Sequence, residues 1–215
     1  PRIDPSENPN EGFPAGPEGL LMMGLSLFFG LVVQFGAVGM IILTQDEVVQ
    51  EKQTGTAAWI LSKPVSRQAF ILTKLVSNVI GALVFIVLLT GIVAYIQIFL
   101  AAGVPASLPG YLAGLGVVLL GLAFYVALVI MLGVLFDTRG PVLGIAFTVM
   151  FGGLIIASFV PQIAYILPVA LDKIAPVLVL GQPLPEMAVP QLAFTAIWTV
   201  VFSLVALWQF GRKEL

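Results

Sequence analysis

Long apolar runs dominate the chain, and short charged segments separate them. Asp, Glu, Lys and Arg are absent from four runs: Gly19–Gln45, Leu75–Phe136, Gly140–Leu171 and Met187–Gly211. A helix needs about 20 apolar residues to cross the hydrocarbon core of a bilayer, and the longest run can hold two such helices. The pattern predicts spanning helices near residues 20–44, 75–101, 111–136, 141–160 and 189–210.

The apolar runs also decide between the two structures that can span a bilayer. Backbone groups in lipid must be hydrogen-bonded within the protein, which leaves helices and closed barrels. Barrel strands alternate apolar and polar residues, whereas these runs are too long and too continuous for that pattern. We therefore predict an all-α, polytopic helical membrane protein, with an extracytoplasmic segment at 1–19 and a transmembrane domain at 20–215.

The basic residues predict how the chain is oriented. Lys and Arg in short loops favour the cytoplasm. If successive spans alternate in direction, one side holds seven basic residues, four of them in 45–74, and the other side holds Arg2 and Lys173. The distribution predicts a multi-pass protein of the cell membrane, with its N-terminal segment outside and its C-terminus in the cytoplasm.

The chain is predicted to begin outside the cell, and the number of predicted spans is odd. Residues 1–18 resemble neither a signal peptide nor a transit peptide. Either a leader has been removed, or an upstream span precedes Pro1, and the odd number favours the second alternative. We therefore expect five visible spans of a total of six.

The segment 161–188 is apolar but unsuited to spanning. It contains five prolines, and Asp172 and Lys173 lie near its middle. A charged residue at the bilayer centre costs about 2.5–3.5 kcal/mol on insertion scales. We predict short, broken re-entrant helices at the outer face that cap a pathway, with Lys173 as the interfacial partner of Asp172.

Composition excludes several classes of function. The chain is 60% hydrophobic and 9% charged, and it has no Cys and no His, the usual ligands of zinc, haem and iron–sulfur centres. It has no Gly-Lys pair and hence no phosphate loop for ATP. The predicted spans carry no charged residue for proton coupling. We expect no enzyme activity, no catalytic, cofactor or metal residues and no nucleic-acid partner, so energy must enter from another protein or the chain is passive.

The segment 45–74 concentrates the polar chemistry, with seven charged residues. Asp46–Lys52 is predicted to extend the preceding span beyond the membrane. Gly55 is predicted to break that helix, as a left-handed terminator does. Glu47 and Glu51 lie four residues apart and face one way on a helix, which is mildly repulsive without a partner. We expect basic residues of neighbouring helices to form ion pairs with both glutamates.

A second, shorter helix is predicted within the same loop. Thr56 can cap a helix over 56–63, and Pro64 can end it. A helix this short is marginal in water, so it needs a surface to pack on. The side chains that it presents form an apolar anchor of the kind that dominates protein interfaces, namely Trp59, Ile60 and Leu61.

The loop is predicted to end where the next span begins. Ser66 can cap that span, and Arg67 and Lys74 lie seven residues apart on one face, where they can reach headgroups or water. A simpler interpretation stays open. These basic residues can serve only as topology determinants, and Trp59 only as an anchor at the membrane interface.

The loop resembles the cytoplasmic signature of the type-2 ATP-binding-cassette (ABC) permeases. The matching pattern is Glu-x-x-x-Gly-Thr, a short helix, Pro-x-Ser-Arg and a later Lys, represented here by Glu51, Gly55, Thr56, Pro64, Ser66, Arg67 and Lys74. Gln53 departs from the pattern where a second acid is common, and 57–59 is less leucine-rich than usual. Looser similarities lie at 135–140, 161–188 and 210–213.

The resemblance implies a function and a set of partners. These permeases usually have six spans, work as pairs and are driven by two separate ABC ATPase subunits, so 56–63 would be the coupling helix seated in an ATPase groove. The resemblance implies the permease subunit of an ABC exporter, paired with a second permease copy or homologue. The alternative is a non-transporting membrane anchor or a regulatory subunit of a larger complex.

Few polar residues lie within the predicted spans. Gln34 and Tyr125 are candidate pathway residues. Gln34 is as well explained by a hydrogen bond between helices, which is worth less than about 1 kcal/mol on average. A pathway this apolar favours an amphiphilic or lipid-like substrate.

Overall fold

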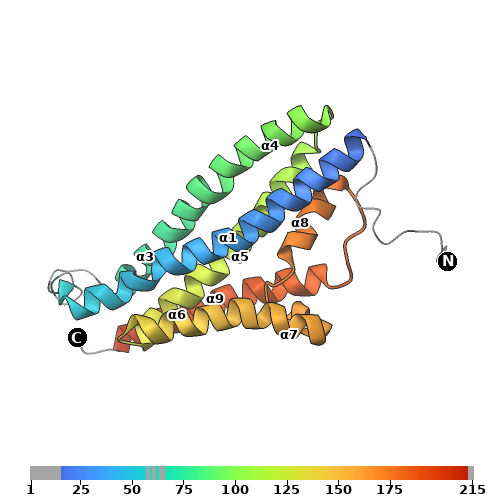
Figure 1. Ribbon diagram of the computed structural model, residues 1–215. Coiled ribbons are helices and arrows are strands. Elements are labelled where there is room, and N and C mark those ends of the chain that lie inside the picture. Colours follow the sequence, from blue (N-terminus) through green and yellow to red (C-terminus); the bar gives the residue numbers. More distant parts are fainter. Residues whose placement is uncertain (1–15, 57–58, 60–61, 63–65, 213–215) are drawn as a thin grey trace.

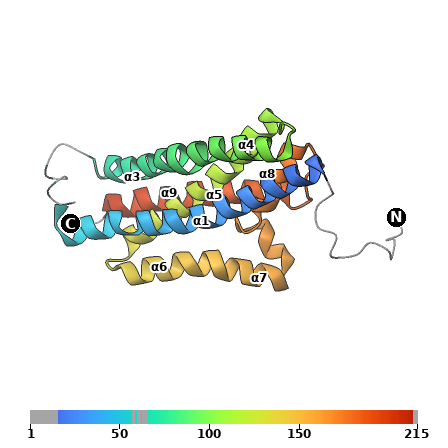
Figure 2. The ribbon, with the colours of Figure 1, turned by 45° about the horizontal axis from the view of Figure 1, so that its top comes forward.

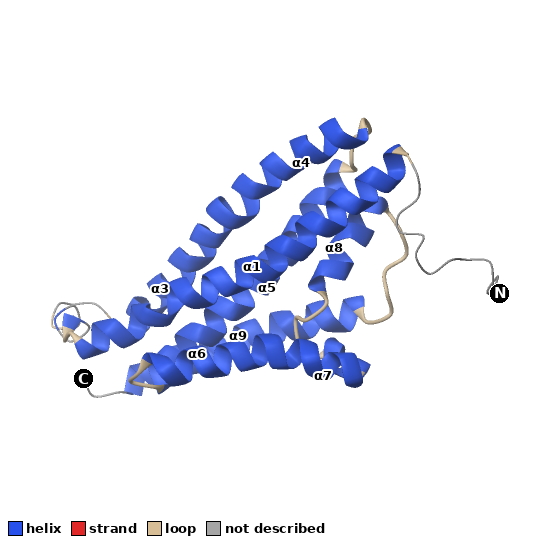
Figure 3. Ribbon diagram, viewed as in Figure 1, coloured by secondary structure: helices blue, strands red, loops and turns tan. Residues whose placement is uncertain are grey.

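The computed structural model describes residues 16–56, 59, 62 and 66–212, and helices account for most of them (Figures 1 and 3). Five helical segments are long and apolar enough to cross a membrane. Two of them are built from consecutive helical pieces. The five are α1 (Pro17–Gln53), α3–η1–α4 (Arg67–Gly81, Ala82–Leu88, Leu89–Ala102), α5 (Leu108–Leu135), α6–η2–α7 (Arg139–Phe147, Thr148–Gly152, Gly153–Phe159) and α9 (Ala188–Arg212).

These five segments confirm the predicted all-α architecture of a multi-pass membrane protein. The boundaries differ mainly where charged residues continue a helix beyond its apolar part. The span predicted at 20–44 is a helix of 37 residues, and the one predicted at 75–101 begins at Arg67. Hydropathy marks the part of a helix that suits lipid, whereas backbone hydrogen bonds decide where the helix ends.

The two ends of the bundle differ in their connections (Figure 1). The loop end is the end that holds the C-terminus of α1, the start of α3, the turn between α5 and α6, and the C-terminus of α9. The far end holds the start of α1 and the connection between α4 and α5. Figure 2 shows α3–α4 and α6–α7 on opposite flanks of α1 and α5.

The helix α5 is the core of the bundle. In its most apolar stretch 78% of the residues are buried, against 39% or less in each of the other four segments. It contacts α1, α3, α6, α8 and α9. The outer helices leave large apolar side chains uncovered, such as Leu100 and Phe159. Such a surface suits lipid or another apolar partner.

The segment 161–188, predicted to hold short, broken helices, contains two short helices, of which the first contacts α7 and α9 and the second packs on α5. They are η3 (Pro161–Tyr165) and α8 (Leu171–Leu180), and α8 ends at Gly181 with a left-handed φ of 64°. The helix α8 packs very closely on α5. A Cβ atom added at Gly110 would lie 2.5 Å from the backbone oxygen of Leu178, so only glycine fits that position.

Candidate functional site

The helix α1 continues well past its apolar part. At 1.5 Å per residue, its 37 residues extend about 55 Å, whereas the hydrocarbon core of a bilayer is about 30 Å thick. Its last two turns contain Asp46–Gln53, which confirms the predicted extension. The helix ends at Gln53, and Gly55 follows with a φ of 73°, the left-handed conformation predicted for the terminator.

One face of this extension is joined to α3. Lys74 Nζ lies 2.6 Å from Glu51 Oε1 in an ion pair that is largely shielded from solvent. The Asn78 amide donates to Glu47 Oε2 at 2.8 Å, and Thr44 Oγ1 donates to Asn78 Oδ1 at 3.4 Å. Glu51 therefore has the basic partner that was predicted, whereas Glu47 binds a neutral amide.

Lys52 joins α1 to the end of α5. Its ammonium donates to the backbone oxygen of Phe136 at 2.6 Å and to Asp137 Oδ1 at 2.7 Å, and its side chain is only 7% exposed. The last carbonyls of a helix lack partners within the helix and carry partial negative charge. Lys52 satisfies such a carbonyl while it binds a carboxylate, and Gln53 reinforces the contact by donating to the Asp137 carbonyl at 2.7 Å.

A third ion pair joins α1 to α6. Arg139, the first residue of α6, places its Nε 2.5 Å from Asp46 Oδ1. We call the six residues of these three ion pairs the charge clamp. They are Asp46, Glu51, Lys52, Lys74, Asp137 and Arg139. The charge clamp fixes the end of α1 to α3, to the end of α5 and to the start of α6.

The sequence did not place four of these residues in a site. Asp46, Lys52, Asp137 and Arg139 looked like ordinary charges near the ends of spans. Lys52 lies 84 residues before the carbonyl that it binds. The usable signal was the very short charged turn at 137–139, which must lie beside another polar group wherever α5 ends.

The loop between α1 and α3 is described in part. Trp59 is 63% exposed, and its backbone N–H donates to the Gly55 carbonyl at 3.0 Å. The hydroxyls of Thr54 and Thr56 are 2.8 Å apart. Ile60, Leu61 and Pro64 lie outside the described residues, and so does most of the helix predicted over 56–63.

The start of α3 confirms the predicted cap. Ser66 Oγ accepts a hydrogen bond from the backbone N–H of Ala69 at 3.1 Å, which satisfies one of the unpaired donors at the helix N-terminus. Arg67 is half-buried in the first turn. Lys74, expected to face headgroups or water, instead pairs with Glu51 and also lies 5.7 Å from the centre of the Phe70 ring.

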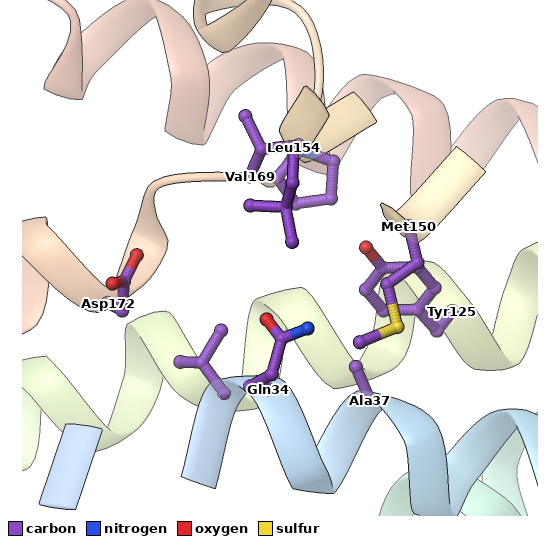
Figure 4. Close-up of a pocket in the computed structure, with 9 residues that line it drawn as sticks. Gln34, Ala37, Tyr125, Met150, Leu154, Val169 and Asp172 are labelled. Atoms are coloured by element: carbon purple, nitrogen blue, oxygen red, sulfur yellow. The ribbon is translucent and has the colours of Figure 1, made fainter. Parts of the chain in front are cut away.

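The two candidate pathway residues meet at one cavity of about 50 Å³ (Figure 4). Gln34 comes from α1 and Tyr125 from α5, and Asp172 of α8 lines the same space. Among the described residues, neither the Gln34 amide nor the Tyr125 hydroxyl has a hydrogen-bond partner. The hydrogen bond between helices considered for Gln34 is therefore not formed within that part of the chain.

Asp172 sits at the rim of this cavity, in the first turn of α8. Burial raises the pKa of its carboxyl above the ordinary value, while the charge of Lys173 opposes the rise. No ion pair within 4.0 Å joins Asp172 to Lys173 in the described structure, so the expected pairing of these neighbours is not formed. A partly desolvated carboxyl and two polar side chains are therefore left around one small space.

Comparison with known proteins gives one match. The model of a family described as "Protein of unknown function (DUF2705)" matches residues 10–215. No curated protein and no solved structure matches the chain. The match overturns the membership of the type-2 ABC permeases that the loop motif implied. A glycine terminator, a serine cap and a proline stop are general solutions for ending and starting helices, so the pattern is less specific than the resemblance assumed.

Proposed function

The chain belongs to the DUF2705 family of proteins of unknown function, and we propose that it forms the membrane pathway of an ATP-driven exporter. Separate ATPase subunits would dock on the loop between α1 and α3 and drive the chain from there. This proposal places the chain in the cell membrane with the loop end in the cytoplasm, in line with the excess of basic residues on that side.

The charge clamp is the observation that carries the proposal. A force applied to the loop reaches α1 at Gly55, and the three ion pairs pass it to α3, α5 and α6 at the same level. A loop that only connects two spans does not need this bracing. The bracing suits a segment that must move several helices together.

The chain's own chemistry supports an external source of energy. The full sequence has no phosphate loop, and the apolar runs contain no Asp, Glu, Lys or Arg that could carry protons through the membrane. An exporter built on this chain therefore needs a partner that hydrolyses ATP.

The exposed surfaces fit the proposed partners. Trp59 is well exposed at the loop end. Tryptophans that become buried when a partner binds are frequent anchors of protein interfaces. Between α1 and η1, a largely apolar groove of about 490 Å³ is lined by Phe28, Phe35 and Ile86 among others. We propose that such uncovered faces contact membrane lipids and a second copy or homologue of the chain, because two ATPase subunits need two loops.

The test is purification of the full chain from its native membranes with its bound partners, followed by measurement of ATP hydrolysis. We expect a co-purifying ATPase whose binding and activity are lost in Trp59→Asp. Gln68→Asp is the matched control, because it adds the same charge at an exposed position just beyond the loop. A stable complex that hydrolyses no ATP would contradict the proposal and favour the anchor or regulatory role.

A further inference from the structure

The cavity around Gln34 and Tyr125, which lies near the middle of α1, is built from four separate parts of the chain. α1 contributes Gln34, α5 contributes Tyr125, η2 contributes Met150, and the segment that connects η3 to α8 contributes Pro168 and Val169. A volume of about 50 Å³ is comparable to one or two water molecules, each of which occupies about 30 Å³ in the liquid. The cavity can therefore hold one small polar group.

The walls of this cavity are held in place by buried contacts. Gln191 of α9 is fully buried and donates to the Leu167 carbonyl at 2.8 Å, which fixes the segment from η3 to α8 over the cavity. On the other side, Gly110 and Gly121 allow α8 to approach α5 closely. The polar side chains therefore face a preformed space.

The polar atoms in the cavity are an acceptor-rich set. Tyr125 is only 4% exposed, lines the cavity, and its hydroxyl has no hydrogen-bond partner among the described residues. The Asp172 carboxylate, the Gln34 amide oxygen and the Tyr125 hydroxyl oxygen can each accept a hydrogen bond. A primary ammonium group has three N–H donors and a positive charge, so it matches this set in number, charge and size.

A second cavity adjoins the first and has the opposite character. Its volume is about 260 Å³, it shares Leu154 and Val169 with the first cavity, and its polar side chains are Lys173 and Ser158. Asp172 and Lys173 are consecutive residues, so their side chains leave α8 about 100° apart and enter different cavities. The Lys173 ammonium matches a phosphate, whereas the Ser158 hydroxyl already donates to the Ile155 carbonyl at 2.6 Å.

An exposed apolar surface of α7 lies beside the second cavity. α7 exposes Ile155 and Phe159, which are 60% and 81% uncovered. An acyl chain attached to a head group in the second cavity can lie along this surface. We propose that the two cavities together bind an amphiphile whose head group carries a primary ammonium next to a phosphate. The ammonium occupies the space around Asp172, and the phosphate contacts Lys173.

This inference names a class of substrate for the proposed exporter. Transport of the amphiphile rests on the proposed function, whereas its binding does not. Binding itself needs no ATPase. It is therefore measured on the purified full chain alone, and a chain that binds the amphiphile but recruits no ATPase would contradict the exporter while supporting the site.

The experiment displaces a fluorescent phosphatidylethanolamine from the chain in detergent. The competitors are unlabelled dioleoyl phosphatidylethanolamine, phosphatidylcholine, phosphatidylglycerol and free phosphoethanolamine. Phosphatidylcholine keeps the positive charge but has no N–H donor, and phosphatidylglycerol has no cation. We expect phosphatidylethanolamine to compete about tenfold better than either, because only its head group brings N–H donors on a positive charge to the acceptors of the cavity. If free phosphoethanolamine competes as well as phosphatidylethanolamine, the cavities recognise the same ammonium and phosphate groups, but on a soluble ligand instead of a lipid.

Three variants tie the binding to the cavities. Asp172→Asn is expected to weaken phosphatidylethanolamine binding about tenfold and to narrow the preference over phosphatidylcholine. Glu186→Gln is the control, because it removes the same charge from an exposed site on the connection to α9. Tyr125→Phe removes one hydroxyl and is expected to weaken binding severalfold, which keeps the test open should Asp172→Asn fail to fold. Equal binding of all three phospholipids, or equal effects of Asp172→Asn and Glu186→Gln, would overturn the proposal.

Discussion

The two ends of the bundle treat their charged groups in opposite ways. At the loop end, Glu51 and Lys52 each have a partner of opposite charge within 2.7 Å, and the pairs cross from one helix to another. At the far end, Asp172 and Lys173 are neighbours in sequence but form no ion pair with each other in the described structure.

The loop end is therefore a braced end, whose helices are joined by ion pairs, and the far end is one that can bind a ligand. Three ion pairs stiffen the loop end, although Gln45 Oε1, Asp46 Oδ1 and Glu51 Oε2 are buried there without a hydrogen bond in the described structure. Around the cavity, the Gln34 amide and the Tyr125 hydroxyl have no hydrogen-bond partner among the described residues, and burial disfavours the charged form of the Asp172 carboxyl, so a complementary ligand can supply what they lack. This is the arrangement expected of a protein that is driven at one end and binds at the other.

The largest predicted effect comes from removing the central residue of the braced end. Lys52→Met leaves the Phe136 carbonyl and the Asp137 carboxylate without their shared donor, and we expect a loss of about 2–3 kcal/mol in the free energy of unfolding. Lys173→Met, at the far end, removes the same charge from an exposed side chain and should cost much less. Thermal unfolding in detergent measures both, and equal losses would remove the distinction between the ends.

The next largest effect is expected from a substitution that disrupts the close packing of α8 on α5. Gly110→Ala places a methyl group 2.5 Å from a backbone oxygen of α8, so α8 must shift, and we expect a cost of about 1–3 kcal/mol. Gly116→Ala on the same helix meets nothing within 4 Å and should be neutral or slightly stabilising. The readouts are thermal unfolding and phosphatidylethanolamine binding. Intact binding in Gly110→Ala would show that the cavity does not depend on this contact.

A charge reversal gives a smaller and more specific effect. Glu51→Lys and Lys74→Glu alone each place like charges together, and we expect each to cost about 1 kcal/mol. The double variant restores opposite charges on the same two helices and should recover most of that loss. A double-mutant cycle by thermal unfolding measures the coupling. Additive losses in the double variant would mean that this pair does not brace α1 against α3.

Much of the fold could be predicted because its signals are local. The five spans follow from runs of apolar residues, and the end of α1 and the start of α3 follow from Gly55 and Ser66, whose roles depend on their own backbone. The widened π-helical turns η1 and η2 carry no comparable local signal and were not predicted.

The site was less predictable because its contacts join distant segments. The sequence pointed to Gln34 and Tyr125 but not to Asp172 as their neighbour, since that requires α8 to fold back on α5. Lys52 was similarly missed, because its partners lie across the bundle. The family resemblance failed for a related reason: it relied on local helix-ending chemistry that unrelated chains can share.

In the proposed function, the loop end drives the far end. The chain contains no Cys, so Ser158→Cys gives a single reactive thiol on this chain, placed at the second far-end cavity. The decisive measurement is the rate at which a maleimide labels this thiol in the purified complex with its ATPase, with and without ATP. We predict that ATP changes the rate severalfold and that Lys52→Met abolishes the change while the ATPase stays bound. A labelling rate that is independent of ATP would contradict this coupling between the two ends.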